Sequence, residues 1–227
     1  MTRNFLTFIV FICLLGSLNA KNLFPAQADT AQYLKNPNYQ YEIALYETYK
    51  TKQADIVMLG NSITHGANWN QLLGRNDVIE MGIPSDIVEG MLNRLNFVYE
   101  LEPKIVFILG GINDIYSWIP LETIMVNYIQ IVKNLQARGI KPVIQSVLYA
   151  GELWPASAER NTQVTKFNNM LKQFADKNGI TYVDLNKTMS KGTFLRPEYS
   201  RDALHLNAKG FHAWVKEIEN VLLNAGI

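Results

Sequence analysis

Short apolar segments alternate with amphipathic segments along most of the chain. The apolar segments are four to six residues long and rich in β-branched residues, as is typical of strands buried on both faces of a parallel sheet. They lie at Asp55–Leu59, Val78–Met81, Lys104–Leu109, Pro142–Val147 and Thr181–Leu185. Strands that alternate with helices predict βαβ units, and right-handed crossovers leave a five-stranded doubly wound sheet as the simplest topology.

The amphipathic segments carry apolar residues at helical spacing. Each predicts one helix, over Ile87–Val98, Leu121–Leu135, Val164–Phe174 and Phe211–Leu222. Proline or glycine closes the first three of these patterns, at Pro103, Gly139 and Gly179. Ahead of the first strand, residues 21–52 are rich in Tyr, Asn and Gln, and we expect a lead-in with one surface helix over Tyr39–Lys50, packed on a single domain of residues 53–227.

The first twenty residues differ from the rest of the chain. Arg3 gives a short basic region, and Phe5–Leu15 is an apolar run of the length found in signal peptides. Small or polar residues follow, and we expect cleavage after Ala20. Because the apolar run is too short to span a bilayer as a stable helix, we expect an exported protein, periplasmic or secreted, with no membrane span after cleavage. An uncleaved N-terminal anchor is the alternative.

Composition narrows the class of protein further. A chain of 227 residues, 48% of them hydrophobic, suffices for one well-cored domain. The net charge of +1 gives no indication of nucleic acid or an anionic surface as a partner, and it leaves the oligomeric state open. The only cysteine, Cys13, lies in the expected signal peptide, so the mature chain would have no disulfide, thiol nucleophile or cysteine-bound metal. Bulky Ile12 before it disfavours lipid attachment.

Polar residues and glycines follow the first three strands. Ser62, in Gly60–Thr64, would project its hydroxyl and its N–H beyond the first strand, or it would simply cap the next helix. Gly82 would offer an N–H after the second strand, and Asn113 an amide after the third. A plain turn is the alternative at both positions. Since the carboxyl ends of parallel strands meet at one edge of the sheet, these groups would lie together.

A fourth polar segment, Arg201–Asn207, precedes the last helix. Asp202 and His205 are three residues apart, so the carboxylate can orient the imidazole, although a turn and a surface histidine are the alternatives. Together the four segments supply a nucleophile, a base with its orienting carboxylate, and donors for an oxyanion. With only three histidines and no metal-binding motif, neither a metal nor a cofactor is expected.

Over about Asp55–Trp214, these motifs resemble those of the SGNH hydrolases, also called GDSL-type esterases. The general pattern is similar to the branch of platelet-activating-factor acetylhydrolase and sialate O-acetylesterase. The matching segments are Gly60–Thr64, Gly82, Gly111–Asp114 and Asp202–His205. The resemblance implies a flavodoxin-like three-layer α/β/α fold and metal-free ester hydrolysis.

The resemblance also implies roles for single residues. Ser62 would be the nucleophile, His205 the base and Asp202 its partner. The Ser62 N–H, the Gly82 N–H and the Asn113 side chain would form the oxyanion hole. Asn61 departs from the pattern, because it stands where the family's short name has Asp.

We expect the substrate to be a small acyl ester, most simply an acetyl ester on a carbohydrate. Tyr116, Trp118 and Trp154 follow two of the strands, where they would stack on sugars or only pack loops, and His65 is assigned no role. A lysophospholipase or thioesterase acting on longer chains is the alternative activity. A carbohydrate- or lipid-binding module without catalysis and a flavin-binding flavodoxin-like protein are the alternative classes, although GNSITHG is a poor phosphate loop.

Overall fold

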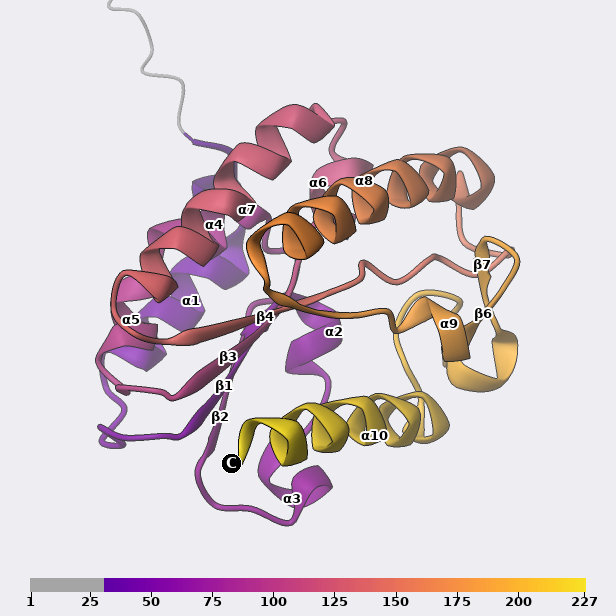
Figure 1. Ribbon diagram of the computed structural model, residues 1–227. Coiled ribbons are helices and arrows are strands. Elements are labelled where there is room, and N and C mark those ends of the chain that lie inside the picture. The colour runs from indigo at the N-terminus through magenta and orange to yellow at the C-terminus, as the bar shows by residue number, and fades with distance from the viewer. Residues whose placement is uncertain (1–30) are drawn as a thin grey trace, which may run out of the picture. The chain divides into compact units, whose positions relative to one another are not determined.

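A computed structural model describes residues 31–227 of the chain (Figure 1). The expected signal peptide of residues 1–20, its cleavage after Ala20 and the first ten residues of the expected lead-in lie outside the described residues.

The centre of the fold is a five-stranded parallel sheet in the order β2-β1-β3-β4-β5. Every residue of β1 and of β3 is buried, which explains their uninterrupted apolar sequences. The strands are β1 (Ile56–Gly60), β2 (Val78–Gly82), β3 (Ile105–Leu109), β4 (Lys141–Gln145) and β5 (Thr181–Val183). All five predicted strands are confirmed to within two residues at each end.

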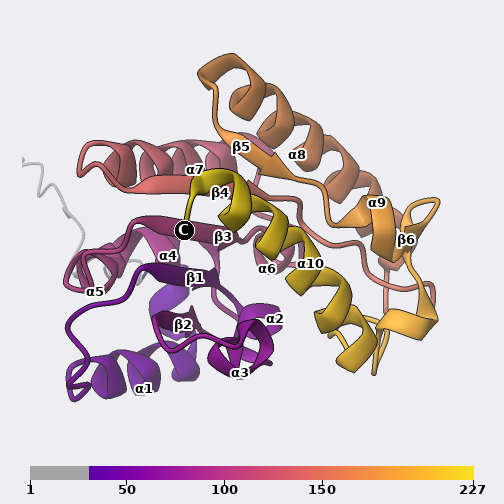
Figure 2. The same ribbon diagram turned by 60° about the horizontal axis from the view of Figure 1, so that its bottom comes forward.

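Helices cover both faces of the sheet, so the predicted three-layer α/β/α architecture is confirmed (Figures 1 and 2). One face carries α4 (Val88–Asn93), α5 (Leu95–Tyr99), α7 (Leu121–Gln136) and α8 (Ser157–Asn178). The other carries α3 (Trp69–Leu73) and α10 (Ala208–Ala225). Trp69 and Trp214 join these two helices in an edge-to-face contact, with ring centroids 4.7 Å apart.

The prediction of one continuous helix over Ile87–Val98 is wrong. The segment forms α4 and α5, and between them the backbone of Arg94 leaves the helical region, with φ −113° and ψ 16°. The Arg94 guanidinium is fully buried and donates to the carbonyls of Gly60 and Met81 at 2.9 and 3.0 Å. These bonds to the carboxyl ends of β1 and β2 offset the break in the helix.

The described part of the lead-in consists of a 3-10 turn, Gln32–Lys35, and α1 (Pro37–Tyr46), which ends four residues earlier than predicted. Asn36 caps α1 and also donates to the Pro84 carbonyl at 2.8 Å, which ties the helix to the loop after β2. Buried Tyr39 anchors α1 as well, and the helix lies beside β2 (Figure 2).

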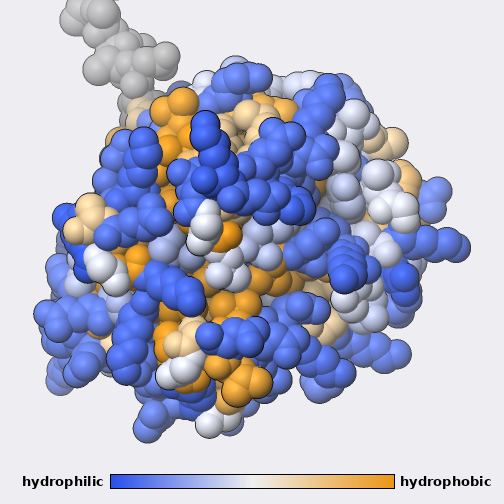
Figure 3. Space-filling model, viewed as in Figure 1, coloured by the Kyte–Doolittle hydropathy of each residue, from blue (hydrophilic) through white to orange (hydrophobic). Residues whose placement is uncertain are grey.

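The remaining elements are short. They are α2 (Ser62–His65), α6 (Ile112–Tyr116), α9 (Asn186–Met189), β6 (Ser190–Lys191), β7 (Phe194–Leu195) and a 3-10 turn, Pro197–Tyr199. Hydrophilic residues cover most of the face seen in Figure 3, with patches of hydrophobic residues between them. Among residues 31–227, none of the helices has the length and apolar character needed to cross a bilayer.

Candidate active site

Ser62 is the first residue of α2, immediately beyond β1. Asn61 caps this helix, because its side-chain oxygen accepts the Ile63 N–H at 3.0 Å. The capping role that was the alternative for Ser62 therefore belongs to its neighbour. The Ser62 hydroxyl instead lies 3.0 Å from Nε2 of His205, a residue 143 positions further along the chain.

The loop before α10 holds His205 against Asp202. Nδ1 of the imidazole lies 2.8 Å from Oδ2 of Asp202, while Oδ1 of the same carboxylate accepts the backbone N–H groups of Leu204 and His205 at 3.0 and 2.7 Å. A proton on Nδ1 would be shared with the carboxylate, which leaves the Nε2 lone pair directed at Ser62. The structure therefore brings Ser62, His205 and Asp202 into one hydrogen-bonded series.

The same contacts act on the charge of Asp202. Partial burial alone would raise the pKa of its carboxyl group. The hydrogen bonds from the backbone and ring of His205 and from the Leu204 N–H outweigh this effect, so the pKa of Asp202 is lowered. The residue is consequently a stable anion beside the imidazole at neutral pH.

Asn113 enters the site from α6. The helix follows Gly111, which has a φ of +125°. A Cβ at this position would lie only 2.7 Å from the Phe167 ring, so both the backbone and the space exclude larger residues. The half-buried amide of Asn113 donates one hydrogen to the Asp86 carbonyl at 2.8 Å. An amide nitrogen has two hydrogens, so the second stays available for a ligand.

The expected direction of the Gly82 N–H is wrong. The Ile56 N–H donates to the Asp77 carbonyl, and the Ile83 N–H donates to the Gly60 carbonyl. The peptide N–H and C=O groups of the odd-numbered residues along β2 therefore point toward β1. Gly82 faces the opposite way, toward the open edge of the sheet, and its N–H donates to the carboxylate of Glu80. This donor therefore points away from β1 and the loop that carries Ser62.

Ser85 provides another N–H in the same loop, one that the sequence did not indicate. The loop begins against Gly60, where Ile83 donates at 3.1 Å, and ends at Asp86, whose carbonyl accepts from Asn113. Ser85 lies between them with a φ of +63°, and within residues 31–227 its N–H has no acceptor. A glycine there would have indicated a positive φ, whereas serine gives no such signal.

Two buried carboxyl groups support these loops. Asp86 pairs with Arg94 at 2.9 Å, and burial raises the pKa of Asp86 to about 6 against the opposing effect of the guanidinium. Asp114 accepts the Val88 N–H at 3.0 Å, and burial raises the pKa of Asp114 to about 7. The supporting roles of Asp86, Arg94 and Asp114 were not predicted. The one indication in the sequence was an arginine within an otherwise apolar helix pattern.

The three predicted substrate-binding aromatic residues differ in position. Trp154 packs edge-on against the His205 ring, with centroids 6.4 Å apart, and so borders the hydrogen-bonded series. Tyr116 donates to the Pro155 carbonyl at 3.2 Å. Trp118 is 66% exposed and covers the buried guanidinium of Arg160, whose central carbon lies 3.1 Å from the ring centroid.

A doubly wound sheet that carries a serine, a histidine and an aspartate in series at its carboxyl edge is typical of enzymes that hydrolyse esters. Residues 58–213 match the model of the GDSL-like Lipase/Acylhydrolase family, and the chain belongs to this family. The resemblance seen in the sequence is thereby confirmed, and the protein is a carboxylic ester hydrolase.

Solved structures of similar fold include a GDSL-like lipase from Bacteroides thetaiotaomicron, 23% identical, which covers 83% of this chain and 98% of its own with a TM-score of 0.72. A lipase/acylhydrolase from Enterococcus faecalis is 22% identical over 76% of this chain and 97% of its own, with a TM-score of 0.66. An acetyl xylan esterase is 20% identical over 74% and 98%, with a TM-score of 0.63. Among curated proteins, none matches this chain.

Proposed function

We propose that the protein is a serine esterase that removes a small acyl group, most simply acetyl, from a carbohydrate. The observation that carries the proposal is the continuous series from the Ser62 hydroxyl through His205 to Asp202, with spacings of 3.0 and 2.8 Å. Hydrogen-bond distances of this length are those at which proton transfer during acyl transfer operates.

The reaction proceeds in two halves. Ser62 Oγ attacks the ester carbonyl while His205 Nε2 takes the hydroxyl proton, and the tetrahedral intermediate collapses when the alkoxide leaves with that proton. The acyl-enzyme is then attacked by a water that gives its proton to His205, and the acid departs as Ser62 recovers a proton. Asp202 keeps the imidazole oriented and stabilises its cation in both halves.

Three donors would hold the developing oxyanion. Two of them, the Ser62 N–H and the free amide hydrogen of Asn113, are donors expected from the sequence. The third is the unpaired Ser85 N–H, which replaces the expected N–H of Gly82. Each such donor contributes roughly 10²–10³-fold to kcat.

Aromatic residues beside Ser62, His205 and Asp202 support a carbohydrate as the substrate. Sugar rings present apolar C–H faces that stack on aromatic side chains, and Trp154 and exposed Trp118 flank the loops that carry His205 and Asn113. The structural likeness to an acetyl xylan esterase agrees with this substrate class. The longer-chain alternative has its own support in Leu153, which is 92% exposed next to Trp154.

Chain-length dependence separates these two substrates. We expect kcat/KM on p-nitrophenyl esters to fall from acetate to octanoate, because a site built for a small acyl group would not accommodate the added methylenes, each of which would gain up to about 0.8 kcal/mol in a true acyl pocket. A steady rise with chain length would overturn the sugar-ester proposal and favour the lysophospholipase or thioesterase.

A fluorophosphonate probe tests the nucleophile directly. Peptide mapping should find the label on Ser62 and nowhere else, and a Ser62→Ala variant should take up none. Ser85→Ala serves as the matched control and should be labelled like the wild type, since it removes a hydroxyl from the same edge of the sheet. Stoichiometric labelling of Ser62→Ala would contradict the assignment.

We also propose that the protein is exported, because basic Arg3 and an apolar run of signal-peptide length stand at the N-terminus. Protein recovered outside the cytoplasm should begin at Lys21. An N-terminus at Met1 in that fraction would instead support an uncleaved anchor.

A further inference from the structure

A cavity of about 400 Å³ lies over β2, and neither Ser62, Asp202 nor His205 lines it. Its walls come from the end of α1 and the segment after it, from α5 and from the start of α3. Four aromatic residues contribute to these walls: Tyr46, Tyr49, Trp69 and Phe97. The volume falls within the range of small-molecule sites.

The cavity covers the open edge of the sheet. Because the peptide groups of the odd-numbered residues along β2 point toward β1, the peptide N–H and C=O of Glu80 point outward, where no further strand of residues 31–227 accepts them. Val78 also faces outward, but its N–H is already taken by Asn70 Oδ1 at 3.1 Å. The floor of the cavity therefore offers backbone hydrogen-bonding groups at Glu80 among apolar side chains.

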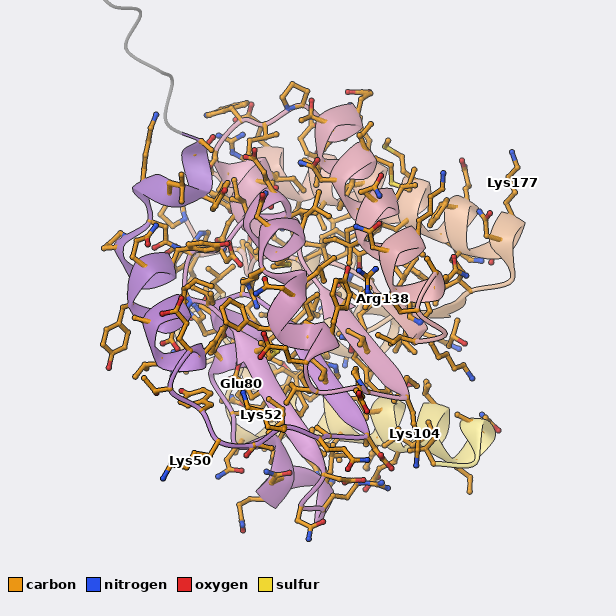
Figure 4. The ribbon with its side chains drawn as sticks, turned by 90° about the vertical axis from the view of Figure 1, so that its left-hand side faces the viewer. Lys50, Lys52, Glu80, Lys104, Arg138 and Lys177 are labelled. Carbon is orange, nitrogen blue, oxygen red and sulfur yellow. The ribbon has the colours of Figure 1, made fainter. Side chains whose placement is uncertain are left out.

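Glu80 also supplies the charge of this cavity. One carboxylate oxygen accepts the Gly82 N–H, and the other lies 3.4 Å from Nδ1 of His65. Burial raises the pKa of Glu80, whereas a nearby cation would act in the opposite direction and favour its ionised form. At the rim of the cavity, the charged groups of Lys52 and Glu100 lie 3.7 Å apart, so their charges offset each other. Figure 4 shows Lys52 and Glu80 in the same region of this face.

We propose that this cavity binds a small organic ammonium ion with an aromatic or other apolar body. The Glu80 carboxylate and the aromatic residues of the walls attract a cation, while the aliphatic residues of the walls bury its apolar part. The outward-facing carbonyl of Glu80 accepts an ammonium hydrogen. An anion of the same shape would meet the Glu80 carboxylate and be excluded.

The site does not depend on the esterase chemistry. Tyr46, Tyr49 and Lys52 precede residue 58, at which the match to the family model begins. One wall of the cavity is thus built by the lead-in segment, outside the matched domain. This separation makes the proposal independent of the proposed nucleophile and of the proposed substrate.

Three probes that share a phenethyl group and differ in charge test the proposal: phenethylammonium, 2-phenylethanol and 3-phenylpropionate. Calorimetric titration of the wild-type protein should show phenethylammonium binding about tenfold more tightly than the alcohol, a difference of about 1.4 kcal/mol, with no binding of the carboxylate. A crystal soaked in phenethylammonium should place it over β2. Equal affinities, no binding of the amine, or an amine found only beside Ser62 would overturn the proposal.

Two matched variants locate the charge. Glu80→Gln should weaken phenethylammonium binding by about tenfold and leave the alcohol unchanged. Glu100→Gln removes the same charge at the rim, where the side chain is 55% exposed, and should change the affinity by less than about twofold. Unchanged amine binding in Glu80→Gln would refute the role of the carboxylate.

A further variant guards against misfolding of Glu80→Gln. Ala67→Leu keeps every charge but reduces the cavity, because Ala67 lies in its wall. It should lose the amine and the alcohol together while melting near the wild-type temperature. Retained binding of both probes in a folded Ala67→Leu protein would show that they bind elsewhere.

Discussion

Ser85 and Gly82 show how two nearby peptide groups differ in what they can do. The Gly82 N–H is held by Glu80, whereas the Ser85 N–H is unpaired within the described residues because its residue has a left-handed φ of +63°. A non-glycine residue in this conformation costs roughly 1–2 kcal/mol. The donor proposed for the oxyanion is thus maintained at a cost in stability.

Replacing Ser85 with glycine should therefore raise the free energy of unfolding by about 1 kcal/mol, since glycine adopts a positive φ without that penalty. The N–H remains, so turnover of p-nitrophenyl acetate should persist. Urea unfolding measures the stability, with Ser85→Ala as the control that keeps both the φ penalty and the donor. A glycine variant less stable than the alanine variant would contradict the argument.

Asn113→Ala removes one proposed oxyanion donor. We expect kcat to fall roughly 10²–10³-fold while the protein stays folded. If the amide were only a loop support, its loss from the Asp86 carbonyl would lower the melting temperature and leave no intact but slow enzyme. Comparing kcat with the melting temperature of the same sample distinguishes these outcomes.

Asp202→Asn should reduce kcat severely, on the order of 10⁴-fold, because an amide no longer holds the imidazole in the required tautomer. The backbone bonds from Leu204 and His205 can still be accepted by the Asn oxygen, so the loop should keep its conformation. Near-normal turnover in this variant would show that His205 does not depend on the carboxylate.

At the scale of elements, the residue at the break between α4 and α5, Arg94, links the two strands that lead into the site. Arg94 donates to the carbonyls of Gly60 and Met81 near the carboxyl ends of β1 and β2 and pairs with Asp86, all in a fully buried position. Removing one partner of a buried pair leaves the other charge uncompensated. The ion pair therefore matters here for the positions of Ser62 and Asn113 as well as for stability.

Arg94→Met should lower the free energy of unfolding by about 3–5 kcal/mol, because Asp86 then stays buried without its cation. Adding Asp86→Asn to this variant should restore part of the loss, which thermal or urea unfolding of the single and double variants can measure. A double variant less stable than Arg94→Met alone would show that the carboxylate stabilises the loop by itself.

The elements also show what the sequence can and cannot predict. The strands were predictable because burial on both faces demands continuous apolar sequence, as in β1 and β3. The helix break was not predictable, because apolar spacing continues past Arg94 and the carbonyls that its guanidinium binds lie 34 and 13 residues away in the sequence. Residue types indicated Ser62, Asn113, Asp202 and His205, but the direction of the Gly82 N–H depends on the strand register.

For the molecule as a whole, buried Asp114 couples stability to pH. Its pKa is about 7 when folded against an ordinary value of 3.8, so between these values the folded state holds a proton that the unfolded state has lost. Stability therefore falls as pH rises across this range and levels off above about pH 7.

Asp114→Asn should remove that contribution while the Asn oxygen still accepts the Val88 N–H. The melting temperature of the wild type minus that of the variant should decrease from pH 4 to pH 8. Differential scanning calorimetry across this range measures it, and a difference independent of pH would mean that Asp114 is ionised throughout.

His205 lies 143 residues after Ser62 in the sequence, and this separation matters before the polypeptide has folded. The serine follows β1, and the histidine, synthesised later, precedes α10. Under the proposed mechanism, a nascent chain that ends before His205 holds the nucleophile without its base and would not hydrolyse esters. Hydrolysis would thus begin only after His205 has been synthesised and the chain has folded.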